Sequence, residues 1–351
     1  MADGAATAPL LAVEDLSVSF ATEDGRLRVL DGVSFTIPAQ QTVAVVGESG
    51  SGKTVTAHSI LRILPTPPAR IDGGRIAFEG HDLLTVSERA MRSIRGARIA
   101  IVFQDPGAAL DPVQAVGVQV MEAIAIHQSM RRRQRREKAL ELLTAVGFAD
   151  AEARFGDYPH QLSGGMKQRV MIAMALACEP ALLIADEPTT ALDSLGATRV
   201  ADLLDELKRS RKTSLLLISH DISLVADHAD HLVVLYAGQV VEQGPANQVL
   251  AEPRHPYTQG LLASIPPLLR RRRRREHSNL RLRTLEGEPV DLRHLPVGCR
   301  FAPRCPKRFD RCDAAVPPLY DVGEAGMTAR CFLFAPDPAQ PSVPEASDER
   351  G

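Results

Sequence analysis

The sequence lacks any long uninterrupted run of apolar residues. The longest, Val170 to Cys178, falls far short of the roughly 20 residues that a helix needs to cross a bilayer. The first residues, Met-Ala-Asp-Gly-Ala-Ala, do not place a positive region before an apolar one, as a secretory signal does. We therefore expect a cytoplasmic chain that does not span a membrane by itself.

The sequence also has little net charge and few cysteines. A formal net charge of -2 over 351 residues excludes bulk attraction to nucleic acid or to anionic lipid. Five cysteines are too few for a disulfide scaffold in a chain of this length, which leaves burial or metal binding as their uses in a reducing compartment. Four of the five lie between Cys299 and Cys331, so this stretch needs its own explanation.

What the chain does have is enough apolar residues for a large core. With 44% hydrophobic residues, it can form a main domain and an appendage. Alternating residues from Val13 to Phe20 and from Ser34 to Ile37 predict an N-terminal antiparallel β layer, with a loop at 21–28 between them. Compact apolar runs separated by helical stretches predict an α/β fold with a parallel sheet. These runs are Thr42 to Val46, Ile99 to Phe103, Leu182 to Ala185 and Leu215 to Ser219.

Composition changes along the chain divide it into units. Apolar residues at helical spacing predict a helical subdomain at about 112–178, inserted in a main domain at 1–265. Six consecutive arginines, Arg270 to Arg275, follow a pair of prolines and predict an exposed linker at 266–280. A small cysteine-containing domain is expected at 281–335. The remaining 336–351 is rich in Pro, Ser and acidic residues, which predicts disorder.

A phosphate-binding loop is predicted after the strand that ends at Val46. The next eight residues read G-E-S-G-S-G-K-T, which fits the P-loop spacing between a buried strand and a helix. Its glycines let backbone N–H groups converge on phosphate oxygens, and the helix N-terminus adds its positive dipole. A Gly/Ser-rich turn with an unrelated lysine is the alternative, which this context disfavours. The candidate residues are Gly47, Glu48, Ser49, Gly50, Ser51, Gly52, Lys53 and Thr54.

Two carboxylates follow the apolar run that begins at Leu182. Asp186 is placed to hold Mg²⁺ together with the Thr54 hydroxyl, and Glu187 could polarise an attacking water as general base. Taken alone, such a pair is more often a solvated strand end. A P-loop in the same chain reverses that preference.

Residues Leu162 to Arg169 read L-S-G-G-M-K-Q-R, which resembles the signature motif of ABC ATPases. Ser163 and Gly165 present a hydroxyl and a bare backbone N–H at the start of an apolar helix, a site for an anion. In that family Ser163, Gly164 and Gly165 would complete the nucleotide site of a partner subunit. Two ATPase domains would then enclose two ATP molecules head to tail.

Further positions match the family in the expected order. Gln104 resembles the Q-loop glutamine, which contacts Mg²⁺ or water and couples to the membrane domain. Asp193, in Ala191-Leu192-Asp193, resembles the D-loop aspartate at the dimer interface, and His220 resembles the switch histidine that contacts the γ-phosphate. Phe20 is the candidate for stacking on adenine. Alone, each of these has an ordinary structural interpretation, but their order around two stronger motifs favours the functional one.

Finer features resemble the ATPases of oligopeptide and dipeptide importers. Met166 and the run His255-Pro256-Tyr257-Thr258 are similar to that subfamily. The resemblance implies ATP hydrolysis coupled to peptide import at the cytoplasmic face of the membrane. It also implies a second, related ATPase as heterodimer partner, two membrane permeases and a solute-binding protein, with no nucleic acid. The runs of arginine at 131–136 and 270–275 fit a solvated helix face and a linker.

The importer assignment has alternatives. Nickel importers share the same architecture, so the cargo is open between peptides, nickel and another solute. A soluble ABC ATPase of DNA repair, ribosome function or cluster assembly is disfavoured, because such proteins usually carry coiled-coil arms or two ATPase halves in one chain. A regulatory subunit that binds without hydrolysing is disfavoured because Lys53, Asp186, Glu187 and His220 are all present.

Four cysteines, Cys299, Cys305, Cys312 and Cys331, form the remaining candidate site. Four thiolates can complete a tetrahedral zinc site or hold one 4Fe-4S cluster, and either would stabilise a region too small for a proper core. The spacing has no Cys-x-x-Cys pair and is not that of a zinc ribbon. The stretch from Gly298 to Cys305 resembles the cluster-binding region of the importer subfamily, which implies 4Fe-4S, with zinc or unligated thiols as alternatives.

Overall fold

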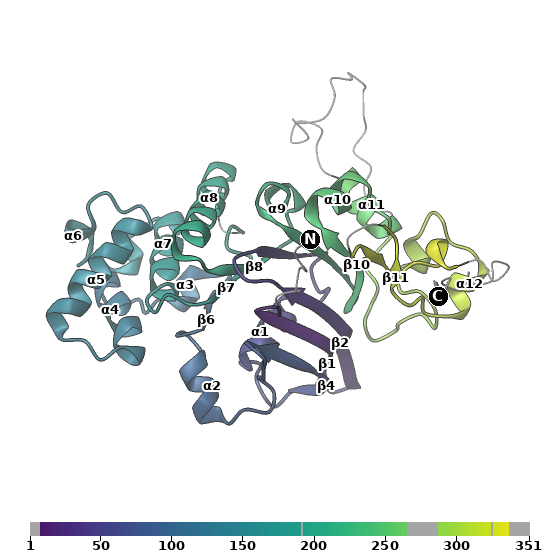
Figure 1. Ribbon diagram of the computed structural model, residues 1–351, viewed down its shortest axis with the longest axis horizontal. Coiled ribbons are helices and arrows are strands. Elements are labelled where there is room, and N and C mark those ends of the chain that lie inside the picture. The colour runs from purple at the N-terminus through teal and green to yellow at the C-terminus, as the bar shows by residue number, and fades with distance from the viewer. Residues whose placement is uncertain (1–7, 191, 265–286, 324–325, 337–351) are drawn as a thin grey trace, which may run out of the picture.

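The computed structural model describes residues 8–190, 192–264, 287–323 and 326–336. In this part of the chain an α/β core lies between a helical subdomain at one end and a cysteine-containing extension at the other (Figure 1). The linker predicted at 266–280 and all but the first residue of the tail predicted at 336–351 lie outside the described residues.

The central sheet contains β3 (Thr42–Val46), β6 (Ile99–Val102), β7 (Leu182–Asp186), β8 (Ser214–Ser219), β9 (His231–Tyr236), β10 (Gln239–Pro245), β11 (Tyr320–Asp321) and β12 (Thr328–Ala329). Their order in the sheet is β11-β12-β10-β9-β3-β8-β7-β6. The strands from β9 to β6 pair in parallel, and β10, β12 and β11 extend the sheet with antiparallel pairs. The predicted parallel sheet is confirmed.

Both faces of the central sheet are covered. Every residue of β3 and of β7 is buried, as expected for parallel strands made of continuous apolar runs. Along β3, Ala44 and Val46 belong to one core cluster, and Val43 and Val45 belong to the other. The strands that carry the predicted nucleotide site are thus held in a core on each side.

The N-terminal layer is a second sheet with β1 (Leu11–Thr22), β2 (Gly25–Ile37), β4 (Ala69–Phe78) and β5 (His81–Asp82). All its neighbouring pairs are antiparallel, in the order β2-β1-β4-β5. The predicted layer is confirmed. The prediction of a loop at 21–28 is wrong, because β1 continues to Thr22 and β2 begins at Gly25. β1 and β2 pair as far as Thr22 opposite Gly25, and Glu23 and Asp24 make the turn between them. Gly25, which starts β2, has a φ of 122°, a conformation that residues with a side chain rarely adopt.

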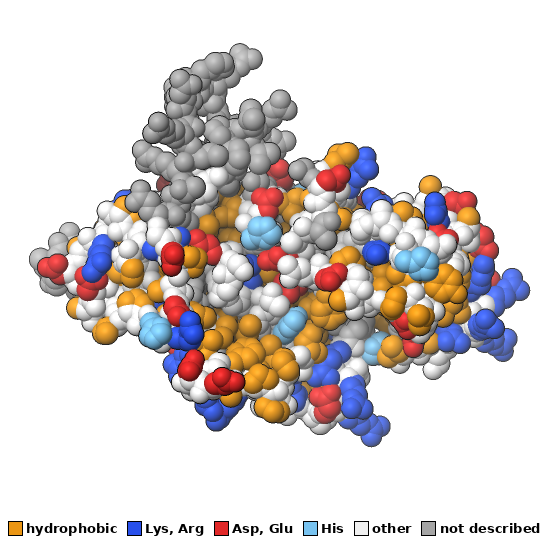
Figure 2. All heavy atoms as spheres, turned by 180° about the vertical axis from the view of Figure 1, so that it is seen from behind, with side chains coloured by type: hydrophobic (Ala, Val, Ile, Leu, Met, Phe, Trp, Pro, Cys, Tyr) orange, Lys and Arg blue, Asp and Glu red, His pale blue; other side chains and the backbone are white. Residues whose placement is uncertain are grey.

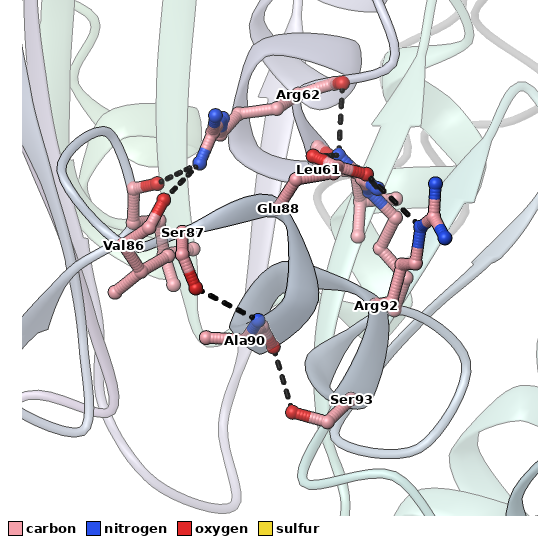
Figure 3. Close-up of polar contacts among 10 residues, drawn as sticks. Leu61, Arg62, Val86, Ser87, Glu88, Ala90, Arg92 and Ser93 are labelled. Atoms are coloured by element: carbon pink, nitrogen blue, oxygen red, sulfur yellow. Dashed lines mark hydrogen bonds and ion pairs between the residues drawn. The ribbon is translucent and has the colours of Figure 1, made fainter.

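Helix α1 (Lys53–Leu61) follows the predicted P-loop and is tied at its far end to α2 (Glu88–Ile94). Arg62, which ends α1 in the left-handed conformation, donates to the carbonyl oxygens of Val86 at 2.7 Å and Leu83 at 3.1 Å (Figure 3). Ser87 caps α2 by accepting from the Ala90 N–H at 3.3 Å. These contacts fix the end of the helix whose N-terminus faces the P-loop.

A helical subdomain lies between β6 and β7. It contains α3 (Pro106–Ala109), α4 (Val116–His127), α5 (Arg132–Ala145), α6 (Ala151–Arg154) and α7 (Gly164–Ala175). Exposed arginines cover the first turns of α5, and Figure 2 shows basic side chains gathered at that outer end of the subdomain. Arg133 pairs there with Glu137 at 3.0 Å, which fits the predicted solvated face.

The remaining α-helices of the described residues are α8 (Ser194–Arg211), α9 (Ile222–His228), α10 (Ala246–Ala251), α11 (Pro256–Ala263) and α12 (Asp310–Ala314). Within the described ranges, no helix is long and apolar enough to cross a membrane.

Candidate functional site

The predicted P-loop connects the end of β3 to the start of α1, and its first glycine is sterically required. A Cβ atom added to Gly47 would lie 2.2 Å from the carbonyl oxygen of Leu235. Gly52, the residue before α1, has a φ of 106°, a conformation that other residues rarely adopt. The loop therefore closes tightly against β9, in the place where a P-loop directs backbone N–H groups at phosphate oxygens.

Lys53 extends across this loop from the first turn of α1. Its Nζ donates to the carbonyl oxygens of Gly47 and Glu48, each at 2.9 Å. Burial lowers the pKa of Lys53, whereas the carboxylates of Glu187 and Asp186 oppose that shift. A cationic group is thus fixed at the mouth of the loop, where outer phosphates would lie.

Asp186 ends β7 beside the first turn of α1. The Thr54 hydroxyl donates to its Oδ1 at 3.1 Å, and burial raises the pKa of Asp186 to about 6. A buried carboxylate and a hydroxyl at this distance are hard oxygen ligands of the kind that Mg²⁺ prefers. The pair therefore fits a magnesium ion bound with a nucleotide.

Three polar side chains contact one carboxylate oxygen of Glu187. Its Oε2 accepts from Gln104 Nε2 at 3.1 Å and from the Thr190 hydroxyl at 2.9 Å, and it lies 3.3 Å from His220 Nδ1. Glu187 has a φ of 47°, and non-glycine residues held in this region are concentrated at functional sites. The structure therefore brings together the three residues predicted to be catalytic.

One cavity of about 480 Å³ unites most of these groups; it is lined by Val29, Ser49, Gly50, Gly52, Lys53, Thr54, Val55, Gln104, Glu187 and His220. Val29, on β2, was missed because an apolar strand residue carries no motif. Phe20 does not line this cavity, and its half-buried side chain packs against the core cluster beneath the N-terminal layer. Its role in stacking on adenine stays a prediction.

The signature residues line a different cavity, of about 730 Å³. Ser163 caps α7 by accepting from the Met166 N–H at 3.3 Å, and Gly164 and Gly165 form the first turn. Asp193 caps α8 by accepting from the Gly196 N–H at 2.7 Å. This second cavity is lined by Ser163, Gly164, Gly165 and Asp193. Within one chain, the signature motif and the P-loop therefore line separate cavities.

The four C-terminal cysteines line a third, small cavity. Cys299 and Cys305 are half-buried, Cys312 and Cys331 are buried, and all four are free thiols. Burial raises the pKa of Cys299, of Cys305 and of Cys331, the last to about 11. In the part of the chain that the structure describes, no group of three or more His, Cys, Asp or Glu side chains is positioned to hold a metal ion.

Comparison with known proteins decides the family. A probable peptide ABC transporter ATP-binding protein of Sinorhizobium fredii is 46% identical over 323 residues, which cover 92% of this chain and 94% of that relative. The chain is an ABC ATPase. It belongs to the ATP-binding proteins of ABC transporters, so the family named by the signature motif is confirmed.

Other relatives of this ABC ATPase match over nearly their whole length. The oligopeptide transport ATP-binding protein AppD of Bacillus subtilis and the dipeptide transport ATP-binding protein DppD of Escherichia coli are each 43% identical. Each match covers 95% of this chain and 99% of the relative. The ABC transporter family model matches residues 30–190, and the model of the oligopeptide/dipeptide transporter C-terminal region matches 241–312.

Solved structures place the ABC ATPase core in the same fold. The ATP-binding cassette MJ0796, in a structure described as a dimeric post-hydrolysis state bound to ADP and Pi, is 26% identical with a TM-score of 0.60. It covers 67% of this chain and 98% of its own. CbiO1 of Clostridium perfringens is 30% identical with a TM-score of 0.60 and covers 70% of this chain and 91% of its own.

Proposed function

We propose that this ABC ATPase powers the import of peptides across the cytoplasmic membrane. The observation that carries the proposal is the similarity to peptide and dipeptide ATP-binding proteins, which continues beyond the ATPase core into the C-terminal region at 241–312. Soluble ABC ATPases with other roles would not account for that region. Nickel or another solute is the alternative cargo.

The nucleotide chemistry follows from the geometry around Glu187. The P-loop and Lys53 would bind the phosphates, while Thr54, Asp186 and Gln104 would hold Mg²⁺, which would supply charge neutralisation at the phosphates. Glu187 accepts a proton from the attacking water, and His220, 3.3 Å from its Oε2, orients that carboxylate and the γ-phosphate. Phe20 is proposed to stack on adenine.

A second ATPase is proposed to complete each nucleotide site. Because the signature motif and the P-loop line separate cavities of one chain, a facing subunit would bring its own signature against this P-loop. The proposed assembly is a heterodimer of two ABC ATPases with two permeases and a solute-binding protein, and this subunit lies at the cytoplasmic face of the membrane.

Purification of the tagged chain from membranes, followed by reconstitution in proteoliposomes, tests this function. We expect permeases and a second ATPase to copurify, and labelled dipeptide to accumulate only with ATP inside the reconstituted system. The Lys53→Ala variant is the control for ATP-driven uptake. Accumulation of nickel without peptide would show that nickel is the cargo. Recovery of the chain without any permease would contradict its proposed role in an importer.

We also propose that Cys299, Cys305, Cys312 and Cys331 hold a 4Fe-4S cluster. The supporting observation is that all four thiols line one cavity, and four thiols are the donors that such a cluster requires. The described side chains are not arranged as a set of metal ligands, so the thiols would have to converge as the cluster binds. A bound metal would stabilise the thiolates, which burial disfavours in its absence. The cluster would act as a structural crosslink in a region with a small core.

Metal analysis of protein purified without oxygen checks this assignment. We expect about four irons and four acid-labile sulfides per chain, with visible absorption, and loss of both in the Cys312→Ser variant. Cys178→Ser is the matched control, because Cys178 does not line the cavity that the other four cysteines share. One zinc ion per chain would show that the four cysteines form a tetrahedral zinc site instead. Absence of any metal from the purified protein would contradict the proposal that they bind a metal.

A further inference from the structure

The cysteine-containing extension contacts the P-loop directly. Both terminal nitrogens of Arg304 donate to the Glu48 carboxylate, Nη1 to Oε2 at 2.8 Å and Nη2 to Oε1 at 2.9 Å. The Arg304 side chain is 5% exposed and that of Glu48 is 23% exposed. A bidentate salt bridge of this kind fixes the orientation of the two side chains as well as the distance between them. Arg304 therefore sets the position of the second P-loop residue, Glu48.

The backbone of Glu48 is held from the same side. Its N–H donates to the Tyr257 hydroxyl at 2.8 Å, and Tyr257 is fully buried. The ring centroid of Tyr257 lies 4.6 Å from that of Tyr236 and 5.5 Å from that of Phe301, which belongs to the extension. Side chain and backbone of Glu48 therefore both depend on the packing of the C-terminal region.

A second chain of contacts links the extension to the middle of the P-loop. Arg300 of the extension donates to the carbonyl oxygen of Ala237 and pairs with Asp31. The next residue, Gly238, donates its N–H to the carbonyl oxygen of Ser51 at 3.0 Å. Arg304 thus contacts the loop directly at Glu48, and Arg300 supports it at Ser51 through Ala237 and Gly238.

Each of these arginines is the chain neighbour of a cysteine. Arg300 follows Cys299, and Arg304 precedes Cys305 at the end of a single 3₁₀ turn, Ala302–Arg304. The Cys299 N–H donates to the carbonyl oxygen of Cys312 at 2.7 Å, which links the turn to α12. We therefore expect a rearrangement around the cysteine cavity to shift the guanidinium groups that contact the P-loop and the residues beside it.

We propose that Arg304 is a positioning residue of the nucleotide site, and that it couples nucleotide binding to the structure around the cysteine cavity. The inference rests on the proposed nucleotide site at the P-loop. The Glu48 carbonyl oxygen accepts from Lys53 Nζ, so a shift of Glu48 moves the phosphate-binding lysine as well as the loop. Coupling of this kind is reciprocal: a bound nucleotide must stabilise the extension as much as the extension stabilises the bound nucleotide.

The first experiment measures binding of a fluorescent ATP analogue and the KM and kcat of hydrolysis for Arg304→Gln, Glu48→Gln and the double variant. We expect each single change to weaken binding and raise KM about tenfold, the effect of losing a charge-assisted hydrogen bond, with a smaller change in kcat. The double variant should be no weaker than either single variant, because both remove the same contact.

Arg308→Gln is the matched control. Arg308 lies in the same extension, pairs with Asp313 at 2.9 Å and is 51% exposed, so its loss should leave ATP binding unchanged. Arg304→Lys keeps the charge but not the two-pronged geometry and should recover part of the affinity.

The second experiment tests the reverse direction in the wild-type chain. Alkylation of Cys299 and Cys305 is followed by mass spectrometry in wild-type protein freed of metal, as in the structure described, with and without Mg²⁺ and ATP. We expect the nucleotide to slow alkylation several-fold, and the protection to disappear in Arg304→Gln. The wild-type result does not depend on the folding of any variant.

The outcomes separate the inference from the function on which it rests. Failure of the wild-type chain to bind ATP would contradict the proposed nucleotide site. Normal ATP binding by the wild-type chain without protection of its cysteines would overturn the coupling. So would Arg304 variants that bind ATP as Arg308→Gln does.

Discussion

Replacement of Glu187 by Gln should stop ATP turnover while ATP stays bound. The amide keeps the shape of the side chain but cannot accept a proton, and a general base contributes about 10²- to 10⁴-fold to rate. Gln104, Thr190 and His220 all reach the same Oε2 of Glu187, so one atom is the centre of the polar network. Steady-state phosphate release and retention of labelled ATP measure the two effects.

Glu141→Gln is the control for this experiment. Glu141 lies exposed on α5, outside both nucleotide cavities, and its replacement should leave turnover unchanged. Undiminished hydrolysis by the Glu187 variant would exclude its role as base.

Replacement of Gly47 by Ala should remove most nucleotide binding. The new methyl group would lie 2.2 Å from the carbonyl oxygen of Leu235, and a backbone atom of a central strand cannot move aside cheaply. Overpacking of this kind costs about 1–3 kcal/mol, and here the strain falls on the loop that cradles phosphate. We expect ATP affinity to fall about ten- to a hundredfold by the conversion of 1.4 kcal/mol per factor of ten.

Gly73→Ala in β4 is the matched change, since its Cβ would meet no heavy atom within 4 Å. We expect it to bind ATP like the unaltered chain. Tight ATP binding by the Gly47 variant would show that the loop can relax away from β9.

Local patterns in the sequence predicted the parts of the fold that local forces dominate. The buried runs at Thr42 and Leu182 became β3 and β7, because parallel strands covered on both faces need continuous apolar residues. The P-loop, the carboxylates of Asp186 and Glu187, and His220 lie at the ends of the neighbouring strands β3, β7 and β8. Residues of the P-loop, Glu187 and His220 line one cavity. Parallel topology explains why residues so far apart meet at the same edge.

Contacts between distant segments could not be predicted in this way. Glu48 and Arg304 are 256 residues apart, and neither charge is distinguishable in the sequence from a solvated surface residue. Tyr257 was noted for its resemblance to a subfamily, but its hydrogen bond to the P-loop depends on how α11 packs. Val29 enters the nucleotide cavity because β1 and β2 form a longer hairpin than alternation alone indicated.

The pairing of β12 with β10 has a consequence for any shortened form of this protein. Ala329 lies opposite Glu242, and the Arg330 N–H donates to the carbonyl oxygen of Val241 at 2.8 Å. Without the extension, β10 would be an open edge of the main sheet, with Val240 and Val241 among its residues. Bare edges of this kind recruit strands from other molecules, so an ATPase core cut after α11 would be expected to aggregate.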